Sequence, residues 1–409
     1  LLWLGASTLP FTSVALAENQ DIFSQIHAVA TQVADSEGYD KAVSALEYGY
    51  GAINSTNPTQ FTGGFGPEFR SQRGGGRLEF TILRPLSRDD LRLGQSNQLK
   101  VEEENLIVQK EAKVKKVENL LLSLMWKLQL HNEELNHLDT RINRLKLISK
   151  HLANSDFVGA EMVAQRTIAS NIISLVSATR SGISSQRSEI VRILKEVMGE
   201  QPGYGNFLPQ YSSAKYLSIA ESCSSYQDAE DIRLADNDIK SKSLQIDISK
   251  ASAKPTVSAG ASVATQLSAK GDTSVIASLQ VNMPSSSYGK HTKMQAEENL
   301  KASEQRLNAL KLERMREIQI IKSELISNVE KLRSIETQLG HKKIEAQLQS
   351  ATQNLIAQQI TLRTYLDLDS QTSDITATTH DLVYSTLMKT QELCGVSGTS
   401  TVEVYSSDN

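Results

Sequence analysis

Apolar residues recur at alternating spacings of three and four over a long stretch of the chain that contains no proline. Val, Leu or Ile fill this series except at His131 and Ser149, over positions 117, 121, 124, 128, 131, 135, 138, 142, 145, 149 and 152. This spacing is typical of the seam of a coiled coil. It predicts a helix from about Arg88 to Asn154, on the order of 100 Å long at 1.5 Å per residue.

The apolar pattern also predicts that this helix turns near Gly159 and returns as a second helix that ends at Gly199. Residues 285–409 contain no proline either, and they repeat the arrangement. There the turn is expected near Thr361, and the return helix is expected to end at Gly395. The sequence therefore predicts two long antiparallel helix pairs.

A segment of alternating apolar and polar residues precedes each helix pair. In residues 255–284 one predicted face carries Val257, Ala259, Ala261, Val263, Val275, Ala277, Leu279 and Val281. In residues 60–84 the corresponding face carries Phe61, Phe65, Leu78, Phe80 and Ile82. Each segment is a predicted β-hairpin. Alternation alone fits a transmembrane β-barrel and a sheet on a soluble core about equally well.

The long helices favour the barrel, and the barrel requires several copies of the chain. Four strands cannot close a barrel, and open sheet edges are not tolerated in lipid. Three copies would supply twelve strands and a ring of helices without a free edge. The predicted fold class is therefore α plus membrane β, in which long antiparallel coiled-coil helices form an α-barrel and a trimer shares a 12-stranded β-barrel.

The same elements occur twice, which predicts two internal structural repeats. The first repeat spans residues 18–200, with a helix, the hairpin 60–84 and a helix pair whose tip lies near 155–160. The second spans residues 201–395, with a helix, the hairpin 255–284 and a tip near 358–363. Residues 396–409 are expected to be a flexible tail.

The first 17 residues are expected to be the remnant of a signal peptide. An apolar run there ends in Ala15-Leu16-Ala17 ahead of Glu18, and an A-x-A triplet is typical of a secretory cleavage site. We expect the mature chain to begin near Glu18, in an exported compartment. The two cysteines, Cys223 and Cys394, are too few for a disulfide framework and are predicted to be packing residues.

Composition and charge narrow the functional classes. Of the 409 residues only 39% are hydrophobic and 5% aromatic, which is thin for several globular cores and favours an elongated architecture. Lys and Arg number 43 against 47 Asp and Glu, so nucleic-acid binding by bulk charge is not expected. His131 and His137 are six residues apart and fall on different helix faces, unlike metal-binding histidines four apart. The sequence predicts no enzyme, no cofactor and no metal site.

Several short motifs resemble those of the TolC family of outer-membrane efflux and secretion channels. A strand that ends in Val281-Asn282-Met283-Pro284 is followed by Gly289 and the helix-forming run Gln295-Ala296-Glu297-Glu298. Phe157-Val158-Gly159 is similar to the family's first helical tip, and Arg363-Thr364-Tyr365-Leu366-Asp367 to its second. The resemblance covers the chain from about residue 20 to 395.

The resemblance implies a homotrimeric duct that extends from the outer membrane into the periplasm of a Gram-negative bacterium. It implies a periplasmic adaptor and an inner-membrane transporter as partners, and outer-membrane lipid around the barrel. Arg363, Asp367 and Asp369 would form the pore gate, and the tips at Gly159 and Thr361 would contact the adaptor. Taken alone, Arg363 and Asp367 also fit a solvated ion pair on a helix face.

Two other classes of protein share parts of this pattern. A periplasmic adaptor also carries a long coiled-coil hairpin, but it has one such hairpin where this chain has two hairpin-plus-helix units. An exported coiled-coil scaffold would not need four amphipathic strands. Drug-efflux, protein-secretion and polysaccharide exit ducts would share the same wall chemistry, so the cargo stays open.

Overall fold

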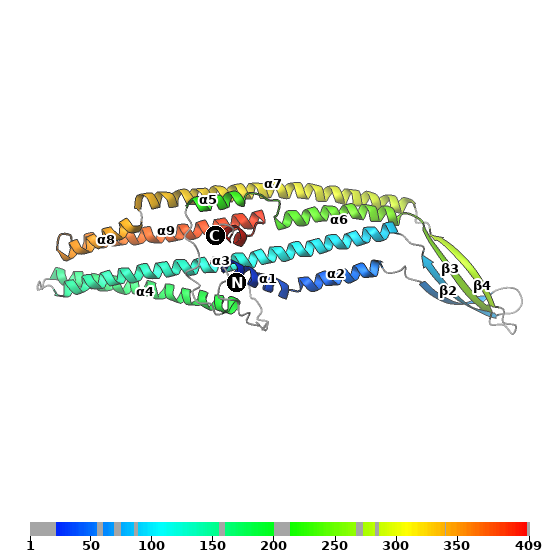
Figure 1. Cartoon of the computed structure of the whole chain (residues 1–409), viewed down its shortest axis with the longest axis horizontal. Coiled ribbons are helices and arrows are strands. Elements are labelled where there is room, and N and C mark those ends of the chain that lie inside the picture. Colours follow the sequence, from blue (N-terminus) through cyan, green and yellow to red (C-terminus); the bar gives the residue numbers. More distant parts are fainter. Residues whose placement is uncertain are drawn as a thin grey trace. The chain divides into compact units, whose positions relative to one another are not determined.

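A computed structural model of the chain describes residues 22–54, 60–68, 75–85, 89–154, 160–199, 213–266, 273–282, 286–339 and 341–406 (Figure 1). The predicted signal peptide lies outside these residues. The chain divides into two compact units. The bundle unit comprises Leu1–Ser36, Glu111–Ala229 and Glu313–Asn409, and the sheet unit comprises Glu37–Lys110 and Glu230–Leu312.

The sheet unit contains four strands and the helices that lead into and out of them. Its elements are α2 (Tyr39–Asn54), β1 (Gln60–Glu68), β2 (Gly75–Pro85), α6 (Glu230–Ser252), β3 (Thr256–Gln266), β4 (Thr273–Asn282), and the first parts of α3 (Asp89–Asn154) and α7 (Ser286–Leu339). The strands form one antiparallel sheet in the order β1-β2-β3-β4. The pairing of β2 with β3 joins the two hairpins.

The register places the apolar residues of both hairpins on one face of this sheet. Residues directly opposite each other in antiparallel strands point to the same side. Such pairs connect apolar positions at Ile82 and Ala261, Val263 and Val275, and Ala259 and Leu279. Val275 and Leu279 keep 73% and 70% of their surface exposed, so this apolar face is not covered by the chain itself.

Two glycines allow the helices of the sheet unit to approach closely. A Cβ at Gly94 of α3 would lie 2.7 Å from Cγ1 of Ile248 on α6. A Cβ at Gly289 of α7 would lie 2.9 Å from Cβ of Ala253, just after α6. Gly289 is one of the residues on which the family resemblance rests, and its physical role is to leave room for this contact.

The bundle unit contains the remaining helices and the apolar core. They are α1 (Ile22–Ser36), α4 (Ala160–Met198), α5 (Ser213–Ser222), α8 (His341–Ile356), α9 (Leu362–Ser397), α10 (Thr401–Ser406), and the later parts of α3 and α7. The predicted seam of α3 is buried at Leu121, Leu128, His131, Leu138, Ile142, Leu145 and Leu152. Gly199 ends α4 with φ 81°, as the pattern predicts, because glycine adopts this left-handed conformation without strain.

The end of the chain differs from the prediction. α9 continues past Gly395 and is closed by Gly398, which has φ 79°. A Cβ at Gly398 would lie 2.0 Å from the backbone oxygen of Asp228, so no larger residue fits there. The expected flexible tail contains α10, whose Tyr405 is 1% exposed and lies edge-on against Trp126 with ring centroids 5.3 Å apart. Burial of these large rings orders the segment.

The two cysteines, predicted to be packing residues, are packed in the core but are also bonded to each other. Cys223 follows α5, Cys394 lies on α9, and they form a disulfide with their Cα atoms 4.8 Å apart. Both residues are fully buried in the core that also contains Trp126. Their sequence separation is 171, and no local pattern signals the pairing, because the packing of α5 on α9 brings the two cysteines together.

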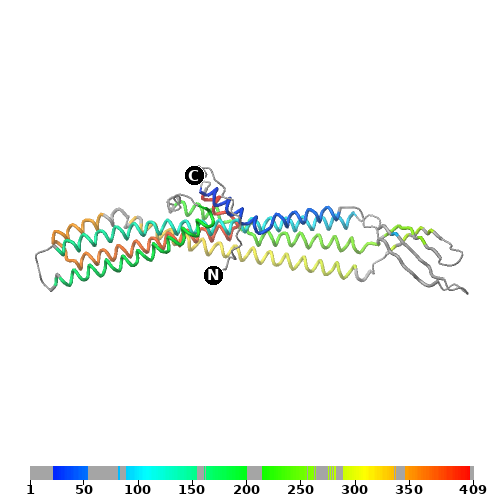
Figure 2. Tube along the Cα trace, turned by 90° about the horizontal axis from the view of Figure 1, so that it is seen from below, coloured from blue at the N-terminus to red at the C-terminus, as the bar shows by residue number. Residues whose placement is uncertain are grey.

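The second helix pair contains a break that the sequence pattern does not predict. α7 ends at Leu339, and a separate helix, α8, leads to the turn before α9. The end of α3, the start of α4 and the turn between α8 and α9 lie at the same end of the bundle unit (Figure 2). In the described part of the chain, no helix combines the length and the apolar character needed to cross a membrane.

Candidate functional site

Thr361, one of the predicted site residues, lies at the end of the turn between α8 and α9. Gln358 has φ 59° in this turn, and the amide of Gln359 donates to the carbonyl of Asn354 at 2.8 Å, which closes the end of α8. Thr361 is the N-cap of α9, and its hydroxyl accepts a hydrogen bond from the amide of Thr364 at 3.2 Å. The hydroxyl explains why threonine suits this position, since it satisfies an amide that the helix leaves unpaired.

The three predicted gate residues do not share one environment. Arg363 and Asp367 are exposed on the first two turns of α9, and no ion pair joins them in the described part of the chain. Asp369 is 1% exposed. It belongs to a buried series with three-four spacing, Leu362, Tyr365, Asp369, Thr372 and Thr376. Asp369 is therefore not an exposed gate residue as predicted, because its carboxylate occupies a seam position and faces the interior.

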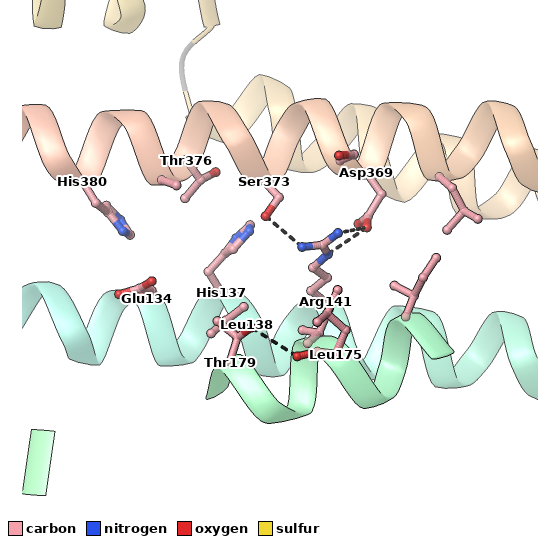
Figure 3. Close-up of a pocket in the computed structure, with 15 residues that line it drawn as sticks. Glu134, His137, Leu138, Arg141, Leu175, Thr179, Asp369, Ser373, Thr376 and His380 are labelled. Atoms are coloured by element: carbon pink, nitrogen blue, oxygen red, sulfur yellow. Dashed lines mark hydrogen bonds and ion pairs between the residues drawn. The ribbon is translucent and has the colours of Figure 1, made fainter. Parts of the chain in front are cut away.

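Asp369 is held by an arginine from the other helix pair. Nε and Nη2 of Arg141, on α3, each lie 2.8 Å from Oδ2 of Asp369 (Figure 3). Nη1 of Arg141 donates to the hydroxyl of Ser373 at 2.8 Å. The Arg141 side chain is 15% exposed. This network of charge-assisted hydrogen bonds links α3 directly to α9. The exposed residues Arg363 and Asp367 precede it on α9.

Apolar side chains surround this pair on the side of the tip. Tyr365 is fully buried among residues of α3, α4 and α8. Burial raises the pKa of the Tyr365 hydroxyl, and the nearby charge of Asp369 raises it further, while Thr352 and Arg144 act in the opposite direction. The low-dielectric surroundings strengthen the Arg141–Asp369 attraction, and they make either charge costly if its partner is removed.

A cavity of about 400 Å³ opens beside the ion pair, between α3, α4 and α9. Its walls combine apolar and polar side chains, namely Glu134, His137, Leu138, Arg141, Ile172, Leu175, Val176, Thr179, Leu366, Asp369, Ser370, Ser373, Thr376, Ala377 and His380. His137 from α3 and His380 from α9 point into the same space between the helices (Figure 3). Among the described residues, no three His, Cys, Asp or Glu side chains lie close enough together to hold a metal ion.

An arginine that was not predicted from the sequence binds the end of α3, next to the first helical tip. Arg166 of α4 donates from Nε to the carbonyl of Leu152 at 2.7 Å and from Nη2 to that of Ala153 at 3.0 Å. These carbonyls end α3, where a cation is favourable. Gly159, the predicted centre of this tip, lies outside the described residues.

Sequence interpretation also missed Arg141 and His380. Arg141 sits next to the seam residue Ile142, and an arginine beside a seam is usually a solvated residue. The three-four series of α9 was the available signal, because it assigns Asp369 to the buried face and leaves Asp367 outside. A buried carboxylate needs a cationic partner, and the neighbouring seam of α3 is where that partner lies.

Comparison with known proteins identifies the fold. No protein-family model matches the sequence, and no curated protein is significantly similar to it. Among solved structures, the outer-membrane protein VceC of Vibrio cholerae aligns over 92% of this chain and 96% of its own, with 14% identity and a TM-score of 0.65. The outer-membrane channel CmeC of Campylobacter jejuni aligns over 94% and 88%, with 10% identity and a TM-score of 0.64.

A membrane protein of Pseudomonas aeruginosa aligns over 93% of this chain and 91% of its own, with 12% identity and a TM-score of 0.66. These alignments extend over almost the whole chain, so the likeness includes the helix pairs and the sheet together. The chain therefore has the fold of the TolC-like outer-membrane channels.

Proposed function

We propose that this protein is one subunit of a homotrimeric outer-membrane channel, a passive exit duct for efflux or type I secretion. The observation that carries this proposal is the four-stranded sheet, one face of which is apolar and exposed. Valine and leucine side chains that keep most of their surface uncovered need an apolar medium, and lipid provides it.

The edges of the sheet support a trimer. β1 and β4 each pair with one strand of the described chain, so each has a second side that can accept another strand. An unpaired edge in lipid leaves backbone amides and carbonyls without partners. Pairing β4 of one copy with β1 of the next removes every edge, and four strands from each of three copies give a barrel of twelve.

The proposed location is the outer membrane, with the helical part extending into the periplasm. A passive duct needs an energised partner, and we propose a periplasmic adaptor and an inner-membrane transporter in that role. The tips at Gly159 and Thr361 are the proposed adaptor contacts. The solved relatives are outer-membrane proteins and channels, which supports this role over an adaptor or a coiled-coil scaffold.

Arg363 and Asp367 are the proposed gate residues, because both are exposed at the start of α9, beside the helical tip. Three-fold symmetry would bring three copies of each side chain around one axis. Asp369 acts through Arg141 as a positioning residue, since it holds α9 against α3 and so fixes where the exposed residues point.

Spin labels on neighbouring residues of β4 test the membrane assignment. Leu279 is on the exposed apolar face, and alternation along a strand places Gln280 on the opposite face. A label at Leu279 should be accessible to oxygen dissolved in the bilayer, whereas a label at Gln280 should be accessible to a water-soluble quencher. Equal accessibility at the two positions would contradict the membrane-spanning sheet.

Loss of the positive charge of Arg363 is expected to increase the conductance of the gate. Replacing Arg363 with serine removes three positive charges from the proposed constriction of the trimer, so we expect a larger conductance in a planar bilayer.

Replacing Asp367 with asparagine should reduce the preference for cations and weaken block by multivalent cations, because the carboxylates that attract them are gone. Asp374, also exposed on α9 but farther from the turn, is the matched control for Asp367. Unchanged selectivity with intact trimers would leave Asp367 as a solvated residue.

A further inference from the structure

Two histidines from different helices share the cavity beside the Arg141–Asp369 pair. His137 is on α3 and His380 is on α9. The ordinary imidazole pKa is about 6.5, so histidine is the side chain that changes charge in mildly acidic solution. The charge balance between α3 and α9 is therefore expected to change over a pH range in which the other side chains of the cavity keep theirs.

The charged groups around His380 come from both helices. Nε2 of His380 lies 4.0 Å from Oε2 of Glu133 on α3, and its side chain is 15% exposed. Glu134, which also lies 3.6 Å from His131, lines the same cavity. Arg141 and Asp369 already compensate each other.

The other elements around α9 add little charge to this side. The cavity-lining residues that α4 contributes are Ile172, Leu175, Val176 and Thr179, all uncharged. Asp381 and Lys331 line a separate groove between α9 and α7. A proton on His380 would therefore place a positive charge beside the carboxylate of Glu133 on the opposite helix.

We propose that His380 and Glu133 form a pH-sensitive contact that tightens α9 against α3 in mild acid. The imidazolium and the carboxylate attract each other only when His380 carries its proton. The stabilisation is thus present at low pH and is lost as the imidazole releases its proton on raising the pH. If the protein is the duct proposed above, α9 carries the gate, and mild acid favours the closed state.

His137 does not have the same effect. It lies four residues before Arg141 on the same helix and shares the cavity with His380, so its proton adds a like charge to both and opposes the contact. Substitution of His137 therefore separates a specific contact from a general effect of histidine charge in the cavity.

Hydrogen exchange of the full-length protein in detergent tests the contact without relying on conduction. The amides of residues 374–388, after correction for intrinsic exchange rates, should be about two- to fivefold better protected at pH 5.5 than at pH 7.5. The variants H380Q and E133Q should each lose this difference, and the double variant should add nothing. H137Q should retain the difference or enlarge it, because it removes a like charge from the cavity.

Two results would overturn the proposal. One is a pH response that persists in both H380Q and E133Q, and the other is a response lost only in H137Q. Single-channel recording of the same samples separates this inference from the duct itself. Pores without a pH response in exchange would refute the contact alone, and a pH response in a protein that forms no pores would refute the duct alone.

Discussion

Replacing Arg141 with methionine is expected to destabilise the bundle unit by about 3–5 kcal/mol, because it leaves Asp369 as a buried carboxylate without a cation. Asp369 is 1% exposed, so water cannot take the place of the guanidinium. Methionine keeps much of the volume of the arginine stem, which limits the effect of a cavity. Thermal unfolding of the purified protein in detergent measures the loss.

The double variant R141M/D369L provides the decisive comparison. Replacement of both members of a buried ion pair with apolar residues is often neutral, so the double variant should recover most of the stability that R141M loses. R192M is the matched surface control, since the Arg192–Glu189 pair is more than half exposed and its loss should be hardly measurable. If R141M and R192M unfolded at the same temperature, the Arg141–Asp369 pair would not be a buried linkage between α3 and α9.

Loss of the disulfide is the second large effect that we expect. The bond between Cys223 and Cys394 closes a loop with a sequence separation of 171, and a loop of this size restricts the unfolded chain strongly. The variant C223A/C394A should therefore be less stable by about 2–5 kcal/mol. Comparison of its unfolding temperature with that of the wild type, with and without a reducing agent, measures the difference.

Reduction should lower the unfolding temperature of the wild type and leave that of C223A/C394A unchanged. A disulfide also persists only in an oxidising compartment, which agrees with the proposed periplasmic location of the bundle unit. Rapid alkylation of both cysteines in denatured, unreduced protein would contradict the bond.

The long helices and the strands could be predicted from the sequence because their periodicity records burial. The spacing of Leu121, Leu128, Leu138 and Leu145 follows one face of α3, and all four are buried. The alternation in residues 255–284 matches the observed pairing of β3 with β4. In both cases each residue reports its own environment, so no knowledge of distant partners was required.

The contacts that depend on distant partners could not be predicted in this way. Cys223 and Cys394 are separated by 171 positions and Arg141 and Asp369 by 228, and no local pattern specifies either pair. For Asp369, the motif that resembles the family's tip suggested a gate, whereas the three-four series of α9 assigns it to the interior. Where a motif and a periodicity disagree about one residue, burial is read from the periodicity.

Three copies of this chain are expected to form one channel through the outer membrane. Single-channel recording of the protein extracted from the outer-membrane fraction and purified without heating tests it most directly. The purified species should be a trimer of the mature chain that produces discrete conductance steps in a planar bilayer. Recovery of the protein as a soluble monomer, or as a membrane protein that conducts no ions, would contradict it.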